Sequence, residues 1–148
     1  MSVPSSRPRS IIRFERAFAA VIVLQAGYVV LGWWKSGGWL DQMPFMTGGR
    51  LAYVVLASVG GLTIHALVLF YAGRRAGEIA RVFVGILLVL RFFSYGRHLW
   101  LGHDPLSAES GLMLLALISH ALATWLVWRP DANSWFAGRP AVDPEIFR

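Results

Sequence analysis

The sequence predicts an all-α fold, an integral membrane four-helix bundle, and three observations support this prediction. Hydrophobic residues make up 56% of the 148 residues and charged residues only 15%, whereas a soluble domain carries about 25% charged residues. The hydrophobic residues gather in four long runs that short polar segments separate. Within these runs apolar and polar residues do not alternate as they do in barrel strands, so helices are the structure that lipid tolerates.

We expect a single domain over residues 1–148, beginning with a segment that has no regular structure. Residues 1–10 contain two prolines and four serines, which predicts disorder. From Ser10, a candidate helix cap, Ile11 and Phe14 alternate with charged side chains. This pattern is typical of a stretch that lies at the membrane surface before the first span begins.

The four hydrophobic runs have the length of helices that cross a membrane. A hydrocarbon core of about 30 Å needs about 20 helical residues. The first run lacks the small-residue cleavage pattern of a signal peptide, so we expect it to be retained. The predicted spans are residues 17–34, 51–71, 81–100 and 111–128.

The distribution of basic residues predicts how the bundle is oriented. An even number of spans places both termini on one side of the membrane, and the opposite side then holds only Lys35, Arg50 and Arg97. The positive-inside rule therefore places both termini in the cytoplasm. The cytoplasmic side would hold Arg7, Arg9, Arg13, Arg16, Arg74, Arg75, Arg81, Arg129, Arg139 and Arg148.

The last segment, residues 129–148, is predicted to be a cytoplasmic tail. Pro130 is expected to end the fourth helix, because proline cannot continue its hydrogen bonding. Trp135 and Phe136 follow closely, and we expect them to anchor the tail weakly to the membrane surface.

Composition excludes several classes of function. The chain has no cysteine, which excludes disulfides, a thiolate zinc site and a cysteine nucleophile. A formal charge of +6 would suggest nucleic acid on a soluble surface, but here the basic residues flank apolar runs, so no nucleic-acid partner is expected. No nucleophile is placed beside a base in the way that catalysis needs, so an enzyme is not favoured.

Each predicted span contributes one strongly polar residue, and these four are the most specific feature of the sequence. Counted from the cytoplasmic ends at 1.5 Å per residue, all of them lie roughly 10–15 Å deep, near the middle of the bilayer. Polar groups are costly at this depth, which makes the layer a candidate site. Its members are Gln25, His65, Arg91 and His120.

The layer has three interpretations. The first is structural, with histidine and glutamine forming hydrogen bonds across helices. In the second, His65 and His120 ligate the iron of a haem b from its two faces. In the third, Arg91 binds an anionic group from a lipid, ligand or partner, because no span contains Asp or Glu. If the third helix ends near Tyr95, the side chain of Arg91 would instead extend outward to the membrane interface.

A second group of polar residues lies in the outer loop after the third span. His98 and His103, together with Asp104, could bind a metal ion. A pair of loop histidines is more often solvated, so no metal site is predicted here.

Three short segments resemble the corresponding parts of small, uncharacterised bacterial inner-membrane proteins with four spans. They are residues 7–15 before the first span, residues 71–75 before the third, and residues 129–136 after the last. The resemblance covers most of the chain in layout and implies a four-span inner-membrane protein without an established activity. The chain departs from this pattern in the third span and the loop after it, which contain Arg91 and His98.

These features predict a small non-enzymatic inner-membrane protein that acts as a helix-packing accessory or interaction subunit of a larger membrane complex. Its expected partners are the lipid bilayer and either another membrane protein or a second copy of the chain. One alternative function is a haem b-binding electron carrier with axial His65 and His120. Another is a small transporter or lipid- or anion-binding protein that uses Arg91.

Overall fold

The computed structural model describes residues 7–35, 48–75 and 78–137 of the chain. Within these ranges all regular structure is helical, which confirms the all-α prediction. The helices are α1 (Arg9–Lys35), α3 (Gly48–Arg74), α4 (Glu78–Trp100), α5 (Ala108–Val127) and α6 (Pro130–Phe136). The four long helices contain all but the last residue of the predicted spans.

The described part of the chain contains three helices that are long and apolar enough to cross a membrane. They are Arg9–Gly32, Glu78–Trp100 and Ala108–Val127. Their outward faces expose large apolar side chains such as Val30, Leu90 and Ile118. Contiguous apolar surface of this kind is unfavourable in water and matches a lipid environment. The chain is therefore a helical membrane protein, as the sequence predicts.

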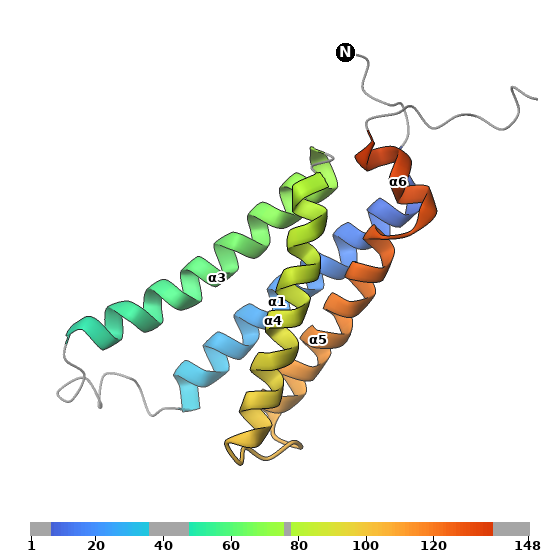
Figure 1. Ribbon diagram of the computed structural model, residues 1–148. Coiled ribbons are helices and arrows are strands. Elements are labelled where there is room, and N and C mark those ends of the chain that lie inside the picture. The colour runs from blue at the N-terminus through green and yellow to red at the C-terminus, as the bar shows by residue number, and fades with distance from the viewer. Residues whose placement is uncertain (1–6, 36–47, 76–77, 138–148) are drawn as a thin grey trace, which may run out of the picture.

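The long helices lie side by side, and neighbours in the bundle run in opposite directions (Figure 1). The pair α1 and α5 forms the most extensive contact, α4 packs on α5, and α3 packs on α1 and α4. The start of α1, the end of α3, the start of α4 and the end of α5 all lie at the end of the bundle where α6 is found. From there α3 diverges from α4 toward its own N-terminal end.

The first helix begins at Arg9, next to the candidate cap Ser10, and continues without a break into the first predicted span. We expected residues 11–16 to lie at the membrane surface, but α1 is one continuous helix from Arg9. The physical reason is packing, because Ile11 and Phe14 are fully buried and belong to one apolar cluster with Phe136 of α6. The predicted disorder of residues 1–10 falls mostly outside the described residues, and the chain is helical from Arg9.

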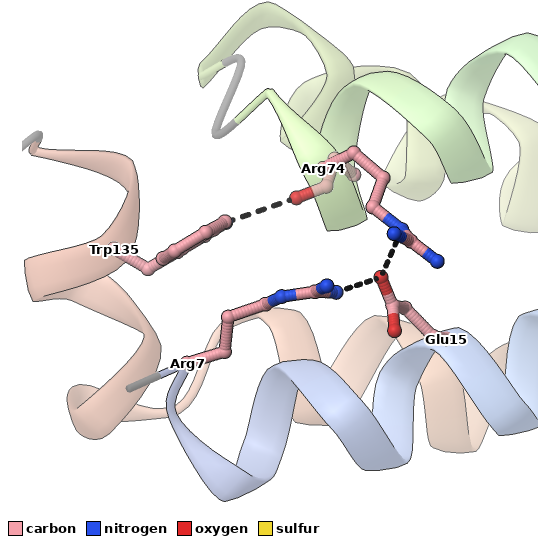
Figure 2. Close-up of polar contacts among 5 residues, drawn as sticks. Arg7, Glu15, Arg74 and Trp135 are labelled. Atoms are coloured by element: carbon pink, nitrogen blue, oxygen red, sulfur yellow. Dashed lines mark hydrogen bonds and ion pairs between the residues drawn. The ribbon is translucent and has the colours of Figure 1, made fainter. Parts of the chain in front are cut away.

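The segment after α5 also differs from the expectation of a surface-anchored tail. Trp135 and Phe136 are each only 8% exposed, since they pack into the protein rather than against lipid. The indole N–H of Trp135 donates a hydrogen bond of 3.2 Å to the carbonyl of Ala72 at the end of α3 (Figure 2). Helix α6 therefore closes one end of the bundle.

Arg81 at the start of α4 connects α4 to α6. Its guanidinium lies 4.0 Å from the ring centre of Trp128 and 5.4 Å from that of Phe136. It also donates a hydrogen bond of 2.8 Å to the side-chain oxygen of Asn133. Cation–π contacts and a hydrogen bond of this kind contribute about 1–2 kcal/mol together.

Replacing Arg81 by glutamine should therefore release α6. We expect proteinase K to cleave residues 130–137 of the detergent-purified variant about 5–30 times faster than those of the wild type, which corresponds to 1–2 kcal/mol. Mass spectrometry of the products measures the rates. Arg97→Gln, an exposed arginine at the other end of α4, is the control. Equal cleavage of the Arg81 variant and the control would show that these contacts do not hold α6.

Candidate intramembrane site

A cavity of about 210 Å³ lies among the four long helices, and it is lined by polar as well as apolar side chains. Three of the four residues of the predicted polar layer contribute to its wall, one each from α1, α3 and α4. The lining residues are Gln25, Tyr28, His65, Leu87, Leu90, Arg91, Ser94 and Met113. The fold thus places polar groups from separate spans around one shared space.

Arg91 and His65 form the polar centre of this cavity. The terminal nitrogen Nη2 of Arg91 lies 3.1 Å from Nε2 of His65, and Nδ1 of His65 lies 2.7 Å from the carbonyl oxygen of Gly61. A guanidinium can only donate hydrogen bonds, so Nε2 accepts and the Nδ1–H donates to Gly61. The imidazole is therefore neutral, and its orientation is fixed from both sides.

The side chain of Arg91 turns inward. Helix α4 continues to Trp100, about two and a half turns beyond Arg91, so the helix does not end near Tyr95. The guanidinium reaches across to α3 rather than outward along α4. The side chain of Arg91 therefore does not extend to the outer interface, which was the alternative expectation.

His120 lies behind His65 and is completely buried. Its Nε2–H donates a hydrogen bond of 3.1 Å to the carbonyl of Val84, which ties α5 to α4. The rings of His120 and His65 lie 5.9 Å apart at 70°. Phe18 of α1 contacts both imidazoles, with ring centres 5.8 Å from His65 and 5.1 Å from His120. His120 is therefore part of the packed interior and not of the cavity wall.

Beside the predicted Gln25, two further polar residues, Tyr28 and Ser94, belong to the cavity wall. Tyr28 lies one helical turn after Gln25 on α1, at a spacing that places both on one side of the helix. Ser94 was missed, although it lies one helical turn after Arg91, at a spacing that places it on the same face of α4. That spacing was the signal that could have identified it.

The charge of Arg91 is not balanced by a carboxylate in the described ranges. The ion pairs found there join Arg7 and Arg74 to Glu15, and Arg129 to Asp131, all at the helix ends. The Nε of Arg91 is buried and has no hydrogen-bond partner in the same ranges. A guanidinium with unused donors is costly away from water, so the cavity is a positively charged site rich in donors.

The arrangement of the two buried imidazoles does not favour haem ligation. In both rings Nε2 already has a partner, Arg91 for His65 and the Val84 carbonyl for His120. An iron ligated by these atoms would require both hydrogen bonds to break. Phe18 also packs against both rings.

The outer histidines differ from the solvated pair that we expected. His98 lies in the last turn of α4 and is buried, with its Nε2 2.9 Å from the hydroxyl oxygen of Ser110. The exposed ring of His103 stacks on it at 4.1 Å. Among the described residues no group of three or more His, Asp or Glu side chains could hold a metal ion. The pair helps to fix the turn between α4 and α5.

Comparison with known proteins adds no identification: no family model, no curated protein and no solved structure matches the chain. The resemblance to small four-span bacterial proteins therefore stays a prediction. What the chain does must be argued from the cavity itself.

Proposed function

We propose that the protein is a four-span inner-membrane protein that binds an amphipathic molecule with an anionic head group on Arg91. The observation that carries the proposal is the unbalanced guanidinium in a cavity between the helices. Gln25, Tyr28 and Ser94 around it supply further hydrogen-bonding groups. An anionic head group would accept from these donors, while an acyl chain would extend between the helices into lipid.

The directions of the helices support four spans. Helix α1 runs parallel to α4, and α5 runs antiparallel to both (Figure 1). If α1 and α4 cross the membrane in the same direction, the chain must return between them, and α3 is the helix that lies there. The distribution of arginines then favours the cytoplasm as the side of both termini.

A carboxylate is the head group that the cavity fits best. Guanidinium pairs with carboxylate through parallel hydrogen bonds, and a cavity of about 210 Å³ admits a small head group rather than a bulky one. The ligand class is therefore a single-chain carboxylate, such as a fatty acid. The role of the protein would be binding or passage of this molecule, without a chemical step.

Native mass spectrometry of the detergent-purified protein, titrated with palmitate, tests this function. We expect one saturable palmitate per chain and about 10- to 100-fold weaker binding by Arg91→Leu, because a hydrogen bond to a charged group contributes about 1.5–3 kcal/mol. Ser94→Ala, which removes only the hydroxyl and changes no charge, should weaken binding about fivefold. Arg97→Leu, from the exposed part of the same helix, should bind like the wild type.

A second probe separates recognition of the head group from hydrophobic binding of the alkyl chain. 1-Hexadecanol has the same chain length as palmitate but no carboxylate, and we expect it not to saturate the site. Equal binding of both probes, or equal palmitate binding by wild type and Arg91→Leu, would rule the proposal out.

The other two functions stay predictions. An accessory or interaction subunit would use the apolar outer faces of the helices, but such faces are expected of any bundle in lipid and do not discriminate. For a haem b-binding electron carrier, the hydrogen bonds of His65 and His120 count against the ligand role. Neither of these functions rests on the guanidinium of Arg91, which has no carboxylate partner among the described residues.

A further inference from the structure

We propose that a second site, a groove between the cytoplasmic ends of α1 and α3, binds one anionic phospholipid of the inner leaflet. The groove has a volume of about 380 Å³. Its polar residues are Glu15, Arg16 and Arg74, and its apolar walls include Ala19 and Leu69. Because α1 and α3 run antiparallel, all three polar residues lie at the end that faces the cytoplasm.

The mouth of this groove carries excess positive charge. The carboxylate oxygen Oε1 of Glu15 lies 2.8 Å from Arg7 and 3.5 Å from Arg74, so one acid already serves two arginines (Figure 2). Arg16 has no ion-pair partner in the part of the chain that the structure describes. The two arginines at Glu15 and Arg16 in the groove wall together carry more positive charge than this one carboxylate balances, so the surface attracts an anion.

Gly73 holds the two helices together at this mouth. A Cβ atom at position 73 would lie 2.6 Å from Oε1 of Glu15, closer than a real Cβ contact allows. Only glycine therefore lets the Glu15 side chain of α1 approach the backbone of α3 so closely. The close approach brings Arg74, the next residue, beside Glu15, with its Nε 3.5 Å from Oε1.

The order of charged and apolar surface along the groove matches a phospholipid. A phosphate on Arg16 and Arg74 would lie at the level of the headgroups, where basic pockets between helices bind anionic lipids. One acyl chain would then run past the small side chains of Ala19 and Ala66 and along Phe70, which is 46% exposed. A free anion would use only the mouth and leave this apolar part empty.

Lipid selectivity in reconstituted bilayers tests the site. Electron spin resonance with spin-labelled phosphatidylglycerol and spin-labelled phosphatidylcholine measures the preference of the protein for the anionic lipid. We expect Arg16→Gln and Arg74→Gln each to reduce this preference about fivefold. Ala66→Phe, which fills the groove and removes no charge, should also reduce it.

The control is Arg13→Gln, which removes the same charge from an exposed position one turn earlier on α1. It should keep the preference of the wild type. An equal loss in Arg13→Gln would indicate general attraction to the surface and would overturn the site, as would an unchanged preference in Ala66→Phe. If inorganic phosphate competed as strongly as phosphatidylglycerol, the occupant would be a free anion, and the lipid site would be overturned. A dimer crosslinked through position 66 would mean that a second copy of the chain fills the groove, which would also overturn the lipid site.

The two sites can fail separately. The lipid site does not rest on the cavity around Arg91, because the groove lies at the helix ends and shares no lining residue with that cavity. Palmitate binding should therefore be unchanged in Arg16→Gln and Arg74→Gln.

Discussion

Replacing Phe18 by alanine is expected to lower the free energy of unfolding by about 3 kcal/mol. The side chain is fully buried, and its ring lies 5.5 Å from Phe14 as well as against the imidazoles of His65 and His120. Lipid is as apolar as the protein interior, so the loss comes from van der Waals contacts and the cavity left behind rather than from exposure to water. The estimate is therefore the lower end of the range known for Phe→Ala substitutions.

Equilibrium unfolding in mixed micelles, followed by the helical circular dichroism signal, measures this loss. Phe92→Ala is the matched control, because Phe92 is 63% exposed on α4 and faces outward. It should change the free energy of unfolding by less than about 0.5 kcal/mol. A Phe18 variant as stable as the Phe92 variant would mean that α1 does not pack on the two imidazoles as described.

Lengths and composition predict the long helices well because lipid constrains them strongly. Each span must satisfy its own backbone hydrogen bonds and cross about 30 Å, so a run of hydrophobic residues nearly defines a helix. The helices accordingly contain all but one residue of the predicted spans. Their ends were less predictable, since α1 starts at Arg9 and a further helix, α6, begins at Pro130.

The ends of the helices depend on tertiary contacts, which local sequence patterns do not predict. The sequence predicts that Ile11 and Phe14 lie on one side of a surface helix and that Trp135 is an interfacial anchor. In the structure all three are buried, because α6 folds back over the start of α1. A sequence pattern gives the apolar face of a segment but not whether protein or lipid covers it.

The same limit applies to the polar layer. Counting residues predicts the depth of each polar group, and Gln25, His65 and Arg91 do share one cavity. Depth does not predict rotation about the helix axis or the partner of each atom. His120 donates its hydrogen bond to Val84 and does not line the cavity, and neither this bond nor the one between Arg91 and His65 could be foreseen.

The number of spans is open to an all-or-none test, because the chain has no cysteine that would react in the background. A membrane-impermeant maleimide should label Leu106→Cys in intact cells, since Leu106 is 92% exposed between α4 and α5. Arg9→Cys and Ala137→Cys, both exposed near the two ends of the described chain, should react only after permeabilisation. The reason is that the four proposed spans would place both ends on one side, and the excess of arginines would place that side in the cytoplasm.

Each other outcome of this labelling has a distinct meaning. If α3 does not cross the membrane, three spans remain, and Arg9→Cys and Ala137→Cys must react on opposite sides. The structure argues against that result, because α6 packs against α1, which brings positions 9 and 137 toward the same end of the bundle (Figure 1). If both react from outside and Leu106→Cys is protected, the four spans stand but their orientation is reversed. The groove between α1 and α3 would then face the outer leaflet instead of the inner one, which contradicts the proposed lipid site. The proposed binding of a carboxylate in the cavity around Arg91 would not be affected.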